Sequence, residues 1–216
     1  MPQYAFILGT FPKLCQAELA AVVNRMVPEC ILSVRQPRIV TAASPFLTND
    51  KINELMSKLG GTIKIGKLIE STSDLDFKNV SAILKSHIDP LFPYGISSFS
   101  IRFKSENDVL FNIKELFKSE NVSSRYIFSR DQKEISAVLL KKQDLQEFIL
   151  FDDNDKLALA KTVAFQNVDA WSKRDFSRPH SDAYSGMLPP KISRILVNLA
   201  LPDKKNPLVL DPFCGM

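Results

Sequence analysis

The stretch Leu208-Val-Leu-Asp-Pro-Phe-Cys-Gly-Met216 carries the clearest fold signal in this chain. Its apolar residues 208–210 predict a buried strand, and residues 211–215 predict a tight turn directly after it. In open α/β sheets, ligands bind in the crevice outside the carboxyl ends of the strands. Gly215 lacks a Cβ, so a ligand can approach the backbone closely there, and Asp211 offers it a carboxylate. The stretch therefore predicts the first ligand loop of an α/β domain.

Other motifs precede this loop in a fixed order. Arg174-Asp175 and Arg178-Pro179 come first, followed by Gly186-Met-Leu-Pro-Pro-Lys191 and by Asn198-Leu-Ala200. Together with Asp211-Pro-Phe-Cys-Gly215, they resemble the THUMP-containing RNA methyltransferases that use S-adenosylmethionine, especially their tRNA guanine-N2 branch. The resemblance is sharp over residues 171–216 and only architectural over residues 1–170.

The resemblance implies an S-adenosylmethionine site whose residues here are Asp211, Pro212, Phe213, Cys214 and Gly215. The family pattern is Asp-Pro-Phe-Cys-Gly-x-Gly, so Met216 fills the variable place and the second glycine would be the next residue. The family positions the target amine with a later Asp/Asn-Pro-Pro-aromatic loop, and these 216 residues contain none. We therefore expect the N-terminal part of a methyltransferase, truncated within the first methyltransferase motif. This part should contain no catalytic residue, bind the cofactor poorly and have no activity of its own.

Composition predicts a globular protein of the cytoplasm. Hydrophobic residues make up 45% of the chain and charged residues 24%, which is ordinary for a soluble domain. No apolar run approaches the ~20 residues of a membrane span, and the start Met-Pro-Gln-Tyr lacks the basic region of a secretory signal. The three cysteines have no paired spacing, so we expect reduced thiols and neither disulfides nor a metal site.

The positive charge is concentrated near the end of the chain. Residues 171–205 hold seven Lys or Arg against three Asp, and the difference of +4 equals the net charge of the whole chain. A local basic cluster is typical of a surface that faces phosphates. The predicted RNA-binding residues are Lys173, Arg174, Arg178, Lys191, Arg194, Arg102, Lys104, Arg125, Lys141 and Lys142. Ordinary surface charge, or an interdomain salt-bridge cluster around Arg174 and Arg178, is the alternative interpretation.

Aromatic residues accompany the same basic cluster. Trp171, Phe176 and Tyr184 lie close in sequence to Arg174 and Arg178. This combination suits stacking on an unpaired base, whereas for any one of these aromatic residues packing against the domain below is the favoured interpretation.

Residues 1–70 follow the pattern of a ferredoxin-like unit. Strands are expected at residues 4–8, 31–34, 38–42 and 62–69. A helix behind Pro12 buries a stripe that includes Cys15, and Asn49 or Asp50 caps a second helix that ends before Gly60. The order strand, helix, strand, strand, helix, strand is the split βαβ pattern.

Residues 71–168 are expected to form a THUMP-like RNA-binding unit. Helices are predicted at residues 77–88 and 105–117, a turn at 93–95, and a half-buried strand at 98–103. Further strands are predicted at residues 125–128, 135–140, 148–151 and 157–165. Residues 169–190 then form a basic linker, and residues 191–216 begin a Rossmann-like methyltransferase domain, whose first helix follows Pro190 and turns Ile192, Ile195 and Leu199 inward.

The predicted fold is thus mixed α+β and α/β, and the predicted function is methyl transfer to the exocyclic N2 of a guanosine in tRNA. A small activating subunit is a second partner that the resemblance leaves open. Two other functions stay in competition: methylation of adenine N6 in DNA or of ribosomal RNA, and RNA binding without catalysis.

Overall fold

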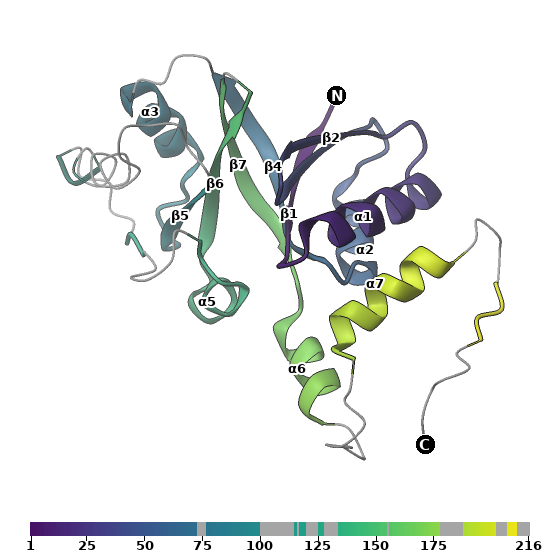
Figure 1. Ribbon diagram of the computed structural model, residues 1–216. Helices are drawn as coiled ribbons and strands as arrows, with labels where there is room; N and C mark the ends of the chain where they lie inside the picture. Colours follow the sequence, from purple (N-terminus) through teal and green to yellow (C-terminus); the bar gives the residue numbers. More distant parts are fainter. Residues whose placement is uncertain are drawn as a thin grey trace.

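The computed structural model describes residues 1–72, 77–99, 115, 117–119, 125–127, 134–154, 156–177, 188–201 and 207–210. These residues build one mixed sheet of seven strands in the order β2-β3-β1-β4-β7-β6-β5 (Figure 1). The strands are β1 (Gln3–Leu8), β2 (Ile31–Gln36), β3 (Ile39–Ala43), β4 (Thr62–Thr72), β5 (Tyr94–Phe99), β6 (Gln146–Asp153) and β7 (Lys156–Phe165). The helices are α1 (Pro12–Met26), α2 (Asn49–Lys58), α3 (Phe77–His87), α5 (Ala137–Gln143), α6 (Val168–Phe176) and α7 (Pro190–Ala200).

The first four strands have the order and pairing of the split βαβ pattern. β1 pairs with β3 and with β4, and β3 pairs with β2, all antiparallel. Helices α1 and α2 cover one face, where Leu19, Ile52 and Leu55 pack on Tyr4 and Phe6. Because alternate residues of a strand point to opposite faces, Ala5 and Ile7 contribute to a different core cluster.

The sheet continues without a break past the predicted boundary at residue 70. β4 pairs along most of its length with β7, β7 pairs antiparallel with β6, and β6 pairs parallel with β5. A second core forms between this half of the sheet and α3, around Leu84, Tyr94 and Phe148. Division of the chain at residues 70 and 168 stays a prediction.

The sheet curls so that β2, at one edge, contacts β6 and β5 at the other edge. The Nε2 of Gln36 in β2 donates to the carbonyl oxygens of Phe99 and Asp152, both at 3.1 Å. Arg35 in β2 pairs with Asp153 at 2.9 Å. The face opposite the helices is consequently buried against itself, with Ala5, Ile7 and Ile39 in the same cluster as Phe151.

Several local predictions are wrong. Thr48, not Asn49 or Asp50, caps α2, because its extended backbone lets Oγ1 accept from the amide of Lys51 at 3.2 Å. Residues 94 and 95 belong to the fully buried strand β5 rather than to a turn. A Cβ on Gly95 would lie 2.3 Å from Ile135 Cδ1, so this glycine serves close packing within a strand.

The next errors concern residues predicted as strands. Residues 137–143 form helix α5, because Ser136 caps it by accepting from the amide of Leu139. Residues 208–210 are exposed and form no strand, since the described part of the chain offers them no neighbouring strand to pair with. Residues 125–127 contribute only an isolated bridge between Tyr126 and Tyr94. The predicted strand residues 100–103, and most of the predicted helix at 105–117, lie outside the described residues.

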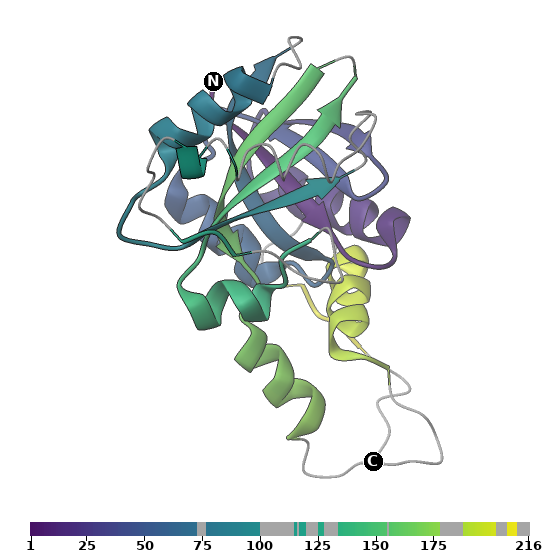
Figure 2. The same cartoon turned by 90° about the vertical axis from the view of Figure 1, so that its left-hand side faces the viewer.

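The last two helices differ in how they meet the rest of the fold. α6 follows β7 and points away from the sheet, and α7 lies beside α1 (Figures 1 and 2). Pro190 begins α7 and Ile195 is buried, as predicted, and Ile192 packs partly buried against the first core. Leu199 is exposed, and Asn198 is the buried residue of that turn. None of the described helices is both long enough and apolar enough to cross a membrane.

Candidate functional site

A buried carboxylate fixes α7 to the first half of the chain. Glu18 of α1 is fully buried, and its two oxygens accept from the amides of Gly60 and Gly61, both at 2.8 Å. Its Oε1 also accepts from Asn198 Nδ2 at 2.6 Å. Arg25 adds a second contact from α1, because its guanidinium donates to the carbonyl of Asn198 at 2.8 Å. Two of these contacts hold α7 on α1, and the other two hold Gly60 and Gly61, after the end of α2, on the same carboxylate.

The same docking positions a cation of α7. Arg194 donates from Nη1 to the carbonyls of Ser57 and Lys58, at 3.1 and 3.4 Å. These carbonyls end α2, where the helix leaves acceptors unpaired and its dipole favours positive charge. Only one guanidinium nitrogen takes part, so the other N–H groups of Arg194 are directed elsewhere.

Helix α6 is held more loosely. Asn167 caps it by accepting from the amide of Ala170 at 3.1 Å. Asp169 in its first turn forms an exposed ion pair with Lys141 of α5. The structure describes every residue of α6, and none of them is buried. An exposed ion pair contributes only about 0–1 kcal/mol.

Trp171 lies at the centre of three cations from two helices. Arg174, one turn farther along α6, has its Cζ 4.9 Å from the centroid of the indole ring. From α7, Arg194 Cζ lies at 5.7 Å and Lys191 Nζ at 5.9 Å. Each distance is within the range of a cation–π interaction. Three positive groups around one ring repel one another, and an anion placed among them would relieve that repulsion.

Hollows surround the same indole. Trp171 lines one of about 420 Å³ between α6 and α7, and one of about 470 Å³ that reaches Met56 and Ser57 of α2. A third, also of about 420 Å³, is lined by Gln166, Trp171, Asp175, Pro190 and Lys191. These volumes lie within the usual range for ligand pockets, about 300–1,000 Å³.

Two groups in the wall of this third hollow have unusual surroundings. Partial burial lowers the pKa of Lys191, while the nearby charge of Asp175 acts in the opposite direction. Gln166 Oε1 is buried and has no hydrogen-bond partner among the described residues. A buried acceptor without a donor costs about 1–3 kcal/mol, so a ligand that donated to it would bind more tightly.

The structure brings together three of the ten predicted RNA-binding residues, namely Arg174, Lys191 and Arg194, around Trp171. Lys173 is exposed on α6. Lys141 and Lys142 are exposed in the last turn of α5, where Lys141 contacts the start of α6. Arg125 is exposed beside β5, where its carbonyl accepts from the amide of Tyr94. Arg102, Lys104 and Arg178 lie outside the described residues.

The predicted cofactor residues Asp211, Pro212, Phe213, Cys214 and Gly215 also lie outside the described residues. Directly before them, the side chains of Leu208 and Leu210 are 98% and 82% exposed. They bury nothing and line none of the hollows around Trp171. The described residues before the turn therefore do not fit an S-adenosylmethionine cradle by themselves. Among the described residues, no group of His, Cys, Asp and Glu could hold a metal ion.

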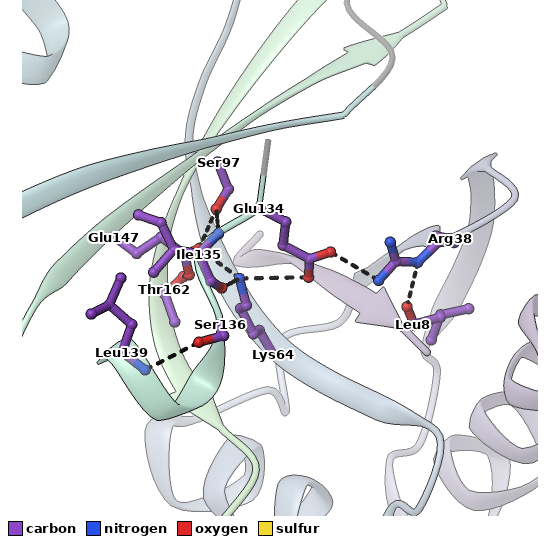
Figure 3. A network of polar contacts seen from close by, with 10 residues as sticks. All are labelled: Leu8, Arg38, Lys64, Ser97, Glu134, Ile135, Ser136, Leu139, Glu147 and Thr162. Carbon is purple, nitrogen blue, oxygen red and sulfur yellow. Dashed lines mark hydrogen bonds and ion pairs between the residues drawn. The ribbon is translucent and has the colours of Figure 1, made fainter. Parts of the chain in front are cut away.

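Sequence reasoning missed a second polar cluster, at the joint between the two halves of the sheet (Figure 3). Lys64 of β4 is fully buried and pairs with Glu147 of β6 at 2.6 Å. Glu147 also accepts from Ser97 and Thr162, and the amide of Ile135 donates to Ser97 Oγ at 2.9 Å. These groups satisfy one another, so we assign the cluster a structural role.

No family model and no curated protein sequence matches the chain, but solved structures match its fold. The chain shares its fold with TrmN from Thermus thermophilus. The TM-score is 0.54 at 11% identity, over 93% of this chain and 55% of that chain.

Two further solved structures are similar. A predicted N6-adenine-specific DNA methylase from Listeria monocytogenes gives a TM-score of 0.48 at 12% identity, over 92% of this chain and 48% of that one. A 4-thiouridine synthetase, in complex with RNA and ATP, gives 0.45 at 8% identity, over 74% and 41%. The chain spans about half the length of the solved structures it matches. At these identities the likeness concerns the fold alone. The seven-stranded sheet with its helices, together with the likeness to TrmN, confirms the predicted mixed α+β class.

Proposed function

We propose that this chain is the N-terminal, RNA-binding part of an S-adenosylmethionine-dependent RNA methyltransferase. The observation that carries the proposal is the gathering of Arg174, Lys191 and Arg194 around Trp171. The similarity to TrmN in fold supports it. So does the sequence of residues 186–191 and 211–215, which resembles the methyltransferase family.

Cations beside an aromatic ring suit a single-stranded or loop region of RNA. Phosphate contacts position a nucleic acid and need positive side chains on one surface. Unpaired bases in RNA stack on aromatic side chains and on guanidinium planes. The Trp171 cluster offers both, and Lys173, Lys141 and Lys142 extend the positive surface along α6 and α5.

The target we propose is the exocyclic N2 of a guanosine in tRNA, as in the branch that the sequence resembles. Residues 211–215 would hold S-adenosylmethionine, and this cofactor would supply the methyl group. The described residues contribute by holding the RNA, because positioning accounts for much of the acceleration of a displacement reaction. The 216 residues alone are expected to bind the cofactor poorly and to transfer no methyl group, and a small activating subunit remains a proposed partner.

Binding of tRNA measured against salt concentration tests the proposal. We expect log K to fall linearly with log salt, because bound cations displace counterions from the phosphates. Arg174→Ala and Lys191→Ala should each weaken binding and reduce that slope by about 1. Lys156→Ala is the matched control, since Lys156 is exposed at the opposite end of β7 from α6. Binding that does not depend on salt, or equal losses in the control, would contradict the proposal.

The nature of the nucleic acid and of the reaction needs separate measurements. Duplex DNA that bound as tightly as tRNA would favour the DNA-methylating alternative. Isothermal titration of the 216-residue chain with S-adenosylmethionine should show no tight binding. Tight binding would contradict the expectation that these residues hold only the beginning of the cofactor site.

A further inference from the structure

We infer that the hollow between Trp171, Gln166 and Lys191 binds one unpaired nucleotide, with its base stacked on the indole and its phosphate held by Lys191. The inference rests on the proposed function and makes it more specific, because it names a site and the state of the RNA that fits it. It predicts that this surface prefers single-stranded RNA to a duplex.

Stacking on the indole of Trp171 selects an unpaired base. The chain has a single tryptophan, and its ring borders three hollows, so part of the indole is accessible from several sides. Every base has a flat π-face, and stacking on an aromatic ring contributes affinity whatever the base. A base inside a duplex already stacks on its neighbours and cannot stack on Trp171, so the ligand must be unpaired.

A cation beside Trp171 can contact the phosphate of the bound nucleotide. Arg174, Lys191 and Arg194 lie within 5.9 Å of the ring centroid. A base that stacks on Trp171 replaces a cation over the ring, and the displaced cation meets the phosphate of the same nucleotide. Lys191 lines this hollow and can make the exchange, whereas Arg194 is tied to the carbonyls of Ser57 and Lys58.

Polar side chains that line the hollow can contact the edge of the base and the ribose. Gln166 lines the hollow, and its side-chain oxygen lacks a hydrogen-bond partner among the described residues. Turning this amide toward the hollow would let it accept from an N–H on the edge of a base. Asp175, which lines the same hollow, offers a carboxylate to an exocyclic amine or a ribose hydroxyl. Base, sugar and phosphate therefore each meet a group that suits them.

The intrinsic fluorescence of Trp171 makes the inference testable on the unmodified chain. A short single-stranded RNA should quench the fluorescence in a saturable way, and the matched duplex should need about tenfold more RNA for the same effect. Adenosine monophosphate and S-adenosylmethionine serve as free-nucleotide and cofactor probes. We expect both to quench only at much higher concentration, because they lack the neighbouring phosphates.

Variants are compared by the anisotropy of labelled single-stranded RNA. Trp171→Ala should weaken binding about tenfold, and Trp171→Phe should retain most of it, because a ring remains for stacking. Gln166→Leu should lose a few-fold in affinity, and Gln3→Leu, at an exposed position in β1, should lose none. Circular dichroism confirms that each variant is folded.

The outcomes separate this inference from the proposed function. If tRNA binds with the expected salt dependence but leaves Trp171 fluorescence unchanged, the nucleotide site is refuted and RNA binding stands. Equal affinity for single-stranded and duplex RNA, or saturable quenching by S-adenosylmethionine at lower concentration than by RNA, would also overturn the site. If no RNA binds under any condition, both proposals fail.

Discussion

Lys64 Nζ lies 2.6 Å from Glu147 Oε1, and both side chains are fully buried. The pair joins β4, from the first half of the sheet, to β6 in the second half. Lys64 also donates to the carbonyl of Ile135 and lies 3.6 Å from Glu134, which in turn pairs with Arg38 (Figure 3). The contact therefore connects both halves of the sheet with the segment that leads into α5.

Replacement of Lys64 by methionine should destabilise the protein strongly. The change leaves the carboxylate of Glu147 buried without its cation, and breaking a buried pair in this way costs about 3–5 kcal/mol. The double variant Lys64→Met/Glu147→Leu should recover part of the loss, because neither charge is left alone. Urea denaturation measures the free energy of unfolding, and Lys67→Met, at an exposed position of the same strand, is the control. If Lys64→Met destabilised the protein no more than the control Lys67→Met, the Lys64–Glu147 pair would not connect the two halves of the sheet as we describe.

Glu18→Ala should loosen α7. It removes the acceptor of two backbone amides and of Asn198, and each donor left unpaired in the interior costs about 1–3 kcal/mol. Hydrogen exchange should become faster in α7 and at Gly60 and Gly61, while the amides of β6 change little. Glu54→Ala, which breaks an exposed pair with Lys51, should change stability by less than about 1 kcal/mol. Unchanged exchange in α7 would mean that apolar packing alone holds this helix.

Gly60→Ala tests the packing of α7 against the backbone at residue 60. A Cβ at this position would lie 2.6 Å from the carbonyl oxygen of Lys191, so α7 must shift, at a cost of about 1–3 kcal/mol. Gly9→Ala is the matched control, because a Cβ there would lie 3.4 Å from its nearest neighbour. Since Lys191 and Arg194 move with α7, Gly60→Ala should also weaken tRNA binding, measured beside Gly9→Ala. Equal behaviour of the two variants in both assays would contradict the close approach of α7 to residue 60.

The regular parts of the fold were predictable because local sequence determines them. The helix after Pro12 repeats its apolar residues at helical spacing, and β4, β6 and β7 have β-prone apolar runs. Residues 135–140 have such a run too, but a serine cap converts most of it into α5. The run at residues 208–210 shows the same limit, because a strand depends on a partner that its own sequence does not contain.

Contacts between distant residues explain the rest. Lys64 appeared as one lysine in an apolar strand, and nothing near it in sequence indicates Glu147, which comes 83 residues later. The cations of the candidate site were predicted from charge, and Trp171 from its neighbours in sequence. Arg194 contacts the end of α2, 136 residues earlier, and only the structure reveals this contact. The side-chain oxygen of Gln166, which has no hydrogen-bond partner among the described residues, could not be predicted for the same reason.

Alkaline pH should destabilise the protein through Tyr126. Burial raises the pKa of this phenol to about 12, and burial raises the pKa of the neighbouring Tyr94 as well, with a contribution from Tyr126. The rings lie 5.1 Å apart. Below an unfolded-state pKa of about 10 both states hold the proton, so Tyr126 has no effect on the pH dependence there.

Between about pH 10 and 12 the unfolded chain loses that proton while the folded protein keeps it, so stability falls as the pH rises. Tyr126→Phe removes this contribution. We expect the wild type to lose about 2 kcal/mol relative to the variant between about pH 8 and pH 11.5. Urea denaturation of both proteins at the two pH values measures the difference, in which the titration of lysines common to both cancels. Parallel losses in the two proteins would show that Tyr126 is as accessible to hydroxide when folded as when unfolded.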